Sequence, residues 1–579
     1  MAITPLPPSP NLENLKKRAK TLLKSVRAGD PVALDQVGPY FGKPDSISLQ
    51  QAQLVIARGY GFSSWTRLKR HIEGIRDESG NQLANRFLDL VIMAYGPVLN
   101  FGPERFRQAA ELLAEHPEIR QDSIYTAAAI GDVGEIDRWL DRDETLINKR
   151  GGYFGWEPLM YAAYARLPET STLGAGLRLL ERGADPNAYY MWGGQYKFTA
   201  LTGVFGQGEG GPINQPEHPD CVAFARALLD LGANPNDSQA AYNRCFEPDN
   251  TCLELLLEYG LSASDKNNWL LVEDDRRMPH PSETMYFQLI SAIKRGYADR
   301  VRLLVDHGVD LNKPDDTYDT RTKGKTPYQT ALLMGEDTIA EMLVEAGADT
   351  GTLTAEDAFQ VACMAGDLSG AREIMDQSGD ALGDVRRTDM LRDAAKRGNR
   401  KALEVMIELG FDVNGQSGCT ALHEAALSGD VDLAQMLLAA GADPTIRDNN
   451  HYATPMGWAL HAEDAAMIAL LDECRMDIFT AAARGNLEQL KARLGEDSAR
   501  VHLRFAELFT GDNPPENGWT TPLIFAVAGD HPEAVRLLLE AGSDLSAADG
   551  KGASVLTIAE KQAGEEVRAE LARFATGTP

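Results

Sequence analysis

Residues that mark several large classes of protein are scarce in this sequence. Its 579 residues include six cysteines, Cys221, Cys245, Cys252, Cys363, Cys419 and Cys474. They form no CxxC pair and lack the spacing of small secreted domains, which excludes a disulfide framework. We therefore expect buried, reduced thiols in a cytoplasmic protein.

Long apolar runs are missing as well. No stretch approaches the roughly 18 apolar residues that cross a bilayer, and the apolar piece Leu88–Tyr95 is interrupted by Asp89. Residues 1–10 are rich in proline and contain no apolar segment, so we expect a disordered start rather than a signal peptide. We expect no membrane partner.

Basic residues are in deficit, with 57 Lys and Arg against 85 Asp and Glu, a net charge of −28. Such a chain repels nucleic acid and anionic lipid on average. The deficit is uneven, because residues 11–76 carry twelve basic and five acidic residues, a local charge of +7 that leaves −35 for the rest. The hydrophobic share of 43% is ordinary for a folded protein.

One phrase recurs along the chain: an apolar helix end, then glycine, a small residue, and Asp or Asn. Its copies contain the glycines Gly183, Gly232, Gly260, Gly308, Gly347, Gly410, Gly441 and Gly542. A second phrase precedes some of them, as in TALHEAALSGD from Thr420 and TPLIFAVAGD from Thr521. A repeated sequence with this period predicts a repeat array.

The copy from Thr420 to Gly441 shows what each part does. Thr420–Ala426 opens a first helix, and Gly429 turns the chain. Leu433 and Leu437 belong to the apolar stripe of a second helix, which Gly441 ends. Since one such unit cannot bury its own apolar face, neighbouring units must stack.

These phrases resemble the ankyrin repeat, a turn plus two helices of about 33 residues. The resemblance implies an all-α solenoid with hairpin loops, of about 12 to 13 units over residues 121–574, followed by a tail at 575–579. It also implies a concave face that binds a folded partner. His423 matches the structural histidine of the family's Thr-Pro-Leu-His motif, which implies hydrogen bonding rather than acid–base chemistry.

The spacing of the repeat-ending glycines reveals insertions. Gly410 and Gly441 are 31 residues apart, whereas Gly183 and Gly232 are 49 apart and Gly260 and Gly308 are 48 apart. We expect insertions near residues 189–220 and 265–282, the latter a solvated loop, and a third near 507–519. Insertions in solenoids fall in loops on one face and often serve binding.

The first insertion is aromatic, with polar groups beside it. The candidate partner-binding residues are Trp156, Tyr189, Tyr190, Trp192, Tyr196, Phe198, Gln215, His218, Asn243 and Arg244. Aromatic, Asn and Arg side chains are typical of interface hot spots. Two interpretations stay open: these residues anchor a partner, or they pack the long loop onto the repeats.

Residues 11–76 predict a basic three-helix module, with Ser48 as a helix N-cap, and residues 77–120 predict connecting helices. Ser48–Glu73 resembles an N-terminal module of some bacterial ankyrin proteins of unassigned function. A helix, a glycine turn and a basic helix over residues 48–75 are also typical of DNA binding, through Arg67, Lys69 and Arg70. Trp65 as a core residue and the acidic body favour a structural module, with a nucleic-acid partner as the alternative.

Catalytic signatures are missing, including GxxxxGK[ST], HExxH and GxSxG. His218, Asp220 and Cys221 leave a weaker alternative, an enzyme with a site in loop 206–220. The main hypothesis is a non-catalytic protein–protein interaction scaffold that needs no catalytic residue, metal or cofactor. The sequence favours a monomer but does not decide the oligomeric state.

Overall fold

The computed structural model divides into two compact units, one of residues 1–331 and 336–350, the other of residues 332–335 and 351–579. It describes residues 12–29, 33–34, 37, 47–60, 65, 68–69, 82–93, 95, 102–192, 195–273, 276–279, 282–315, 322–378, 384–508, 518–548 and 553–575. Four predictions fall wholly or mainly outside these residues: the disordered start, the third helix of the basic module, the centre of the 507–519 insertion, and the tail at 575–579.

Thirteen consecutive helix pairs follow one another within the described part of residues 124–575. The first six are α7 (Ile124–Ile130) with α8 (Val133–Arg142), α9 (Pro158–Tyr164) with α10 (Leu173–Glu181), α11 (Ala200–Phe205) with α13 (Cys221–Asp230), α14 (Ser238–Asn243) with α15 (Thr251–Glu258), α16 (Thr284–Arg295) with α17 (Ala298–Asp306), and α18 (Pro327–Leu333) with α19 (Asp337–Glu345).

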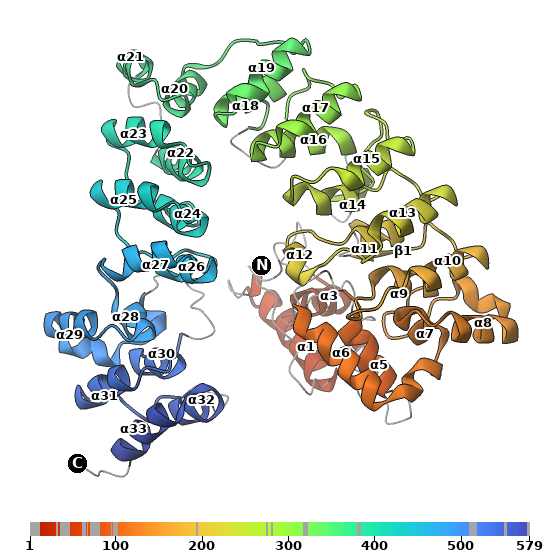
Figure 1. Ribbon diagram of the computed structural model, residues 1–579, viewed down its shortest axis with the longest axis horizontal. Helices are drawn as coiled ribbons and strands as arrows, with labels where there is room; N and C mark the ends of the chain where they lie inside the picture. Colours follow the sequence, from red (N-terminus) through yellow and green to blue (C-terminus); the bar gives the residue numbers. More distant parts are fainter. Residues whose placement is uncertain are drawn as a thin grey trace. The chain divides into compact units, whose positions relative to one another are not determined.

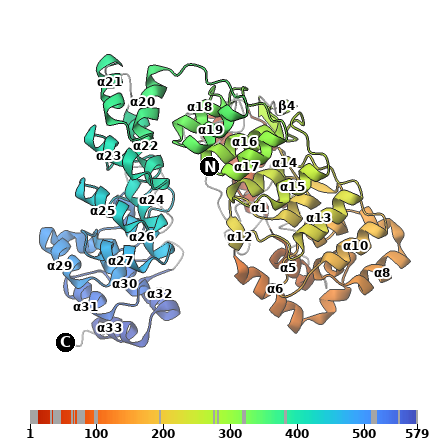
Figure 2. The same cartoon turned by 45° about the horizontal axis from the view of Figure 1, so that its top comes forward.

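The other seven pairs are α20 (Ala355–Met364) with α21 (Leu368–Ser378), α22 (Asp384–Lys396) with α23 (Arg400–Glu408), α24 (Ala421–Ser428) with α25 (Val431–Ala439), α26 (Pro455–His461) with α27 (Ala465–Asp472), α28 (Ile478–Arg484) with α29 (Leu487–Glu496), α30 (Pro522–Ala528) with α31 (Pro532–Glu540), and α32 (Val555–Gln562) with α33 (Glu565–Ala575). Figures 1 and 2 show the pairs of each unit stacked in chain order. The predicted all-α repeat fold is confirmed.

Short local signals set the helix boundaries. Thr420 and His423 form a capping box at the start of α24. Gly429 ends that helix with a φ of 69°, a left-handed conformation that glycine adopts without a Cβ clash. The Asp430 carboxylate accepts the backbone N–H of Leu433 at 3.0 Å and caps α25. Gly441 follows α25 with a φ of 94°, as the repeated phrase predicts.

Stacking of like helices makes the core. In α24 the small side chains of Ala425 and Ala426 are fully buried, and α24 packs against both α22 and α26. Leu433 and Leu437 of α25 are fully buried too. Burying one such leucine contributes about 2 kcal/mol, so each repeat depends on its neighbours for stability.

The asparagine of the recurring phrase ties one hairpin loop to the next. The Asn187 side chain donates to the Gly232 carbonyl at 2.8 Å, and its Oδ1 accepts the backbone N–H of Asn234 at 2.9 Å. Asn414 makes the same pair of bonds with Gly441 and Asp443. One carboxamide therefore satisfies a donor and an acceptor of the following repeat.

The N-terminal module closes its own core. Helix α1 (Leu12–Arg27) packs on α3 (Leu49–Gly59), which Ser48 caps as predicted. Trp65 packs against this core while partly exposed. Helices α5 (Gln82–Val91) and α6 (Pro103–Glu115) lead to the first repeat.

Two short β-hairpins interrupt the helical pattern in the first two insertions. They are β1 (Tyr189–Trp192) with β2 (Tyr196–Thr199), and β3 (Leu270–Glu273) with β4 (Arg276–Pro279). The sequence indicates loops at both places, so the hairpins differ from that prediction. The remaining short elements are α12 (Gly211–Asn214), η3 (Pro117–Gln121), η4 (Glu144–Asn148), η5 (Arg244–Phe246), η6 (Ser498–His502) and η7 (Phe505–Leu508). Among the described helices, none has the length and apolar character to span a bilayer.

Candidate interaction surface around the first insertion

The β1–β2 hairpin presents one aromatic face. Its antiparallel register places Tyr190 opposite Phe198 and Trp192 opposite Tyr196. Because side chains two residues apart on a strand share a face, these four rings lie on the same side of the hairpin. Tyr189 belongs to the other side.

Part of this face is core. Trp156 and Tyr190 stack with ring centroids 4.5 Å apart at 17°, and Tyr190 stacks on Phe198 at 5.3 Å and 28°. All three side chains are at most 7% exposed. They therefore pack the insertion onto the repeats, and their rings do not reach the surface where a partner would contact them.

The accessible part of the hairpin is smaller. Tyr189 is 38% exposed, with the Lys197 ammonium 4.6 Å from its ring centroid. Trp192 and Tyr196 are half-buried. The indole N–H of Trp192 donates to the Tyr95 carbonyl at 2.7 Å, which ties the hairpin to the chain after α5.

The second insertion lies against the first. The backbone N–H of Leu270 donates to the Gln195 carbonyl at 3.0 Å, and Trp269 meets Tyr196 edge-on at 5.3 Å. Trp269 also packs against Tyr242 and Phe287, and Tyr242 packs against Phe246. We call the half-buried rings around Trp269 the aromatic surface: Tyr196, Tyr242, Phe246 and Phe287.

Of the aromatic surface, only Tyr196 is among the residues predicted from the sequence, and the central Trp269 is not predicted either. Phe246, Trp269 and Phe287 come from η5, the second insertion and α16, three separate segments of the chain. Only the stacking of three successive repeats brings them together. No local sequence pattern signals such a cluster.

His218 is buried and uncharged. Its Nδ1 accepts the backbone N–H of Asp220 at 3.0 Å, so its Nε2–H donates to the Thr172 hydroxyl at 2.9 Å. That hydroxyl donates to the Ala162 carbonyl at 2.6 Å. Burial, with the nearby Arg166 charge, lowers the pKa of His218 to about 4. Both ring nitrogens are thus engaged in holding the insertion to α9 and α10.

Acidification should therefore destabilise the first unit. The pKa of His218 lies below the ordinary 6.5, so the unfolded state binds more protons between pH 6.5 and pH 4. We expect the unfolding free energy of the first unit to fall by about 2 kcal/mol when the pH is lowered from 7 to 5, because of this group. Urea unfolding at pH 7 and pH 5 measures this drop in unfolding free energy. The drop should be smaller for His218→Gln than for the unchanged chain or for the control His116→Gln. An equal loss in all three would contradict this role.

The other polar candidates hold the loop in place. Gln215 accepts the backbone N–H of Gly210 on its side chain at 3.0 Å, and Asn243 accepts from Gln239 at 2.9 Å. Arg244 forms ion pairs with Glu217 and Asp249 at 2.9 and 2.8 Å. Gln215, Asn243 and Arg244 are at most 5% exposed, so these side chains do not form the outer surface of the insertion.

The arrangement of loop 206–220 does not form a nucleophile–base pair. The Cys221 thiol interacts with Cys252, and this hydrogen bond, together with burial, raises its pKa well above the ordinary range. Asp220 accepts a hydrogen bond from the Ser171 hydroxyl. Neither group contacts a ring nitrogen of His218 through a side chain, so nothing there activates the sulfur. Within the described residues, no group of three or more His, Cys, Asp or Glu side chains is placed to hold a metal ion.

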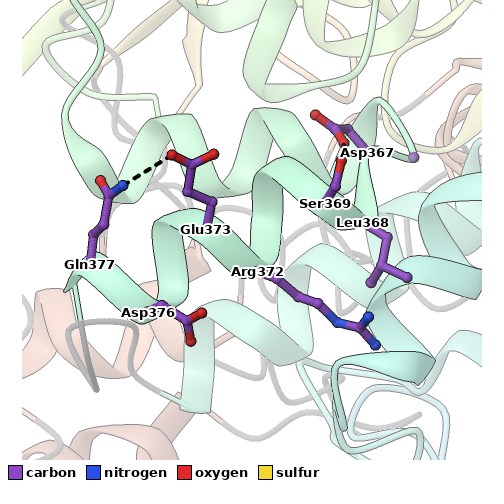
Figure 3. Close-up of a pocket in the computed structure, with 8 residues that line it drawn as sticks. Asp367, Leu368, Ser369, Arg372, Glu373, Asp376 and Gln377 are labelled. Atoms are coloured by element: carbon purple, nitrogen blue, oxygen red, sulfur yellow. Dashed lines mark hydrogen bonds between the residues drawn. The ribbon is translucent and has the colours of Figure 1, made fainter.

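A shallow pocket in the second unit offers no reactive pair either. It is lined by the turn before α21 and by one face of that helix (Figure 3). Its hydroxyl, Ser369, donates to Asp367 at 2.9 Å, and Asp367 also accepts the backbone N–H of Gly370. Gln377 donates to Glu373 at 3.2 Å. These bonds cap and support α21.

The helix pairs of the second unit identify the repeat. Residues 359–448 match the family model of ankyrin repeats in three copies, and residues 519–550 match that of a single ankyrin repeat. The chain contains ankyrin repeats. In the ankyrin copy from Thr420, Nε2–H of His423 donates to the Ala453 carbonyl at 3.0 Å, and burial lowers the pKa of the ring. His423 is structural, as the resemblance implies.

Other ankyrin proteins are similar to parts of the chain. A putative ankyrin repeat protein, FPV031 of fowlpox virus, is 28% identical over 32% of the chain and 46% of its own length. Palmitoyltransferase AKR1 of Lachancea kluyveri is 27% identical over 33% of the chain and 28% of its own length. Human ankyrin repeat and SOCS box protein 6 is 26% identical over 28% of the chain and 33% of its own length.

The chain thus spans less than half the length of each of these relatives. They come from a virus and from eukaryotes, and so give no support to a bacterial origin. The match to the relative named as a palmitoyltransferase covers 28% of that protein's length.

Of the candidate nucleic-acid contacts in the module before the ankyrin array, only Lys69 lies among the described residues, where it is exposed. Arg67 and Arg70 lie outside them. The DNA-binding alternative for residues 48–75 therefore stays a prediction.

Proposed function

We propose that the chain is a non-catalytic scaffold, cytoplasmic and monomeric, that binds a protein partner through the first-helix and hairpin face of its first unit. The observation that carries the proposal is the aromatic surface. Its four half-buried rings come from β2, α14, η5 and α16 and are joined through contacts with Trp269 and Tyr242. Ankyrin repeats are protein–protein interaction modules, which supports the same class of function.

A few large rings, part-buried and held by neighbours, provide most of the energy of an interface and lose little entropy on binding. The rings of the aromatic surface are held by edge-to-face contacts of 5.2 to 5.8 Å. Tyr242 also donates to the exposed Glu209 carboxylate at 2.6 Å, which places a polar group at the rim. A stable interface buries about 1,600 Å² in total, more than these rings alone supply, so neighbouring hairpins take part.

The proposal revises which residues act as contacts. Tyr196 stays a contact residue, with Trp192 and Tyr189 beside it, and Tyr242, Phe246 and Phe287 join it. The other candidates are buried and hold the insertion on the repeats, so we do not propose them as contacts: Trp156, Tyr190, Phe198, Gln215, His218, Asn243 and Arg244.

Truncating the aromatic surface should remove partner binding. We expect the double substitution Tyr196→Ala with Phe287→Ala to weaken binding by about thirtyfold or more, because hot-spot truncations cost about 2 kcal/mol or more. The measurement is affinity capture from the native cell extract, followed by titration of the purified partner.

The matched control is Leu177→Ala with Val222→Ala, two exposed apolar residues on α10 and α13. A partner retained by the unchanged chain and the control, but lost with the double substitution, supports the proposal. Equal retention by all three chains would place the interface elsewhere.

A further inference from the structure

Helix α1 of the N-terminal module carries a straight row of cations. Lys17, Lys20, Lys24 and Arg27 are all exposed, at spacings of three, four and three residues. At 3.6 residues per turn these positions fall within an arc of about 80°, and at 1.5 Å per residue the row is about 15 Å long.

The opposite face of α1 is apolar and buried in the core of the N-terminal module. Leu15, Ala19, Leu22 and Val26 are 0 to 6% exposed and pack in the core shared with α3. This packing fixes the rotation of the helix and so keeps the cationic row outward. It also leaves α1 without the apolar face that an amphipathic helix inserts into a bilayer.

The row is not neutralised by the described part of the chain. None of its four cations forms an ion pair with a described residue, whereas basic side chains of the array are widely paired, such as Arg178 with Glu181 and Arg226 with Glu258. Arg18, which lies outside the row, stacks over the Tyr60 ring with its guanidinium 5.3 Å from the centroid. The acidic residues that the structure describes thus leave these four adjacent cations available to an external anion.

From this row we infer that α1 binds the phosphate backbone of duplex DNA. The observations favour DNA because the row is linear and charged without apolar neighbours of its own. A duplex carries one charge per about 1.7 Å, so 15 Å of it presents about nine phosphates to the four cations. Contacts to phosphate alone position a protein without reading sequence. This function goes beyond partner binding and uses a different part of the chain.

The test is the salt dependence of DNA binding by the full chain. Fluorescence anisotropy of a labelled 24-base-pair duplex of arbitrary sequence would be measured at 50 and 200 mM KCl. Four phosphate contacts predict a logarithmic slope of about −3.6, a loss of affinity of about a hundredfold over this range. Substituting Lys17, Lys20, Lys24 and Arg27 with Gln should abolish measurable binding at 200 mM and flatten the slope.

The control changes the net charge equally at other places. Lys401, Lys491, Lys561 and Arg568 are exposed on α23, α29, α32 and α33, and their substitution with Gln should leave binding unchanged. Circular dichroism of both variants checks the fold. Any of four results overturns the inference: no binding at 50 mM KCl, equal loss in both variants, competition by poly-glutamate as strong as by unlabelled duplex at equal charge, or binding to phosphatidylserine vesicles without binding to DNA.

Discussion

Replacing Trp156 with alanine is expected to lower the unfolding free energy of the first unit by about 3 to 5 kcal/mol, the usual cost of removing a buried tryptophan. Trp156 is 6% exposed and stacks on both Phe154 and Tyr190, at centroid distances of 4.7 and 4.5 Å. Its ring centroid also lies 5.3 Å from that of Tyr164 on α9. Its loss would therefore leave a cavity between the insertion and the repeats.

The matched control is Tyr189→Ala on the same hairpin, which should change stability by about 0.5 kcal/mol or less because its ring is 38% exposed. Urea unfolding followed by far-ultraviolet circular dichroism measures both. A third variant tests the same point: Tyr190→Ala should lower the unfolding free energy about as much as the Trp156 substitution does, since Tyr190 is 7% exposed. Similar small losses for Trp156 and Tyr189 would contradict the assignment of Trp156 to the core.

Local patterns predict the repeat well because its turns are local. The capping box of Thr420 and His423 and the left-handed turn at Gly441 involve residues within four positions, so the neighbouring sequence contains the necessary information. The apolar stripe of α25 is likewise a property of one helix. These features do not depend on which repeat stacks next.

The candidate site is predicted less well because it depends on stacking and on strand register. Tyr189 and Tyr190 are adjacent and chemically identical, but the alternation of β1 exposes one and buries the other. Without the hairpin, sequence analysis cannot separate them. The aromatic surface depends further on three repeats, so its members lie up to 91 residues apart, from Tyr196 to Phe287.

Arg166 shows what sequence reasoning misses inside the first unit. It follows Ala165, the C-cap of α9, and is 6% exposed. Its guanidinium donates to the carbonyls of Ala163 and Ala165 at the end of α9, and to those of Gly203 and Pro216 in the next repeat. These four bonds are 2.6 to 3.0 Å long. Burial lowers its pKa to about 10, so the group stays charged at neutral pH.

This geometry makes Arg166 both a helix cap and a tie between repeats. The last carbonyls of a helix have no partner within it, and here one side chain satisfies two of them. The same side chain holds Pro216, which lies two residues before His218, and so fixes the end of the first insertion. No carboxylate of the described residues forms an ion pair with Arg166, so the dipoles of the four carbonyls stabilise its charge.

The substitution Arg166→Met is therefore expected to destabilise the first unit by about 3 to 5 kcal/mol, since each buried carbonyl left without a donor costs about 1 to 3 kcal/mol. Methionine retains much of the apolar stem, so the loss reports mainly on the hydrogen bonds. Arg150→Met is the control: Arg150 pairs with Glu157 at 2.7 Å, but its side chain is 57% exposed, and such a pair contributes about 1 kcal/mol or less. Urea unfolding compares the two variants, and limited proteolysis within residues 206–217 should accelerate only in Arg166→Met. Equal stability of the two variants would show that the carbonyls find other donors and that Arg166 does not hold the insertion in place.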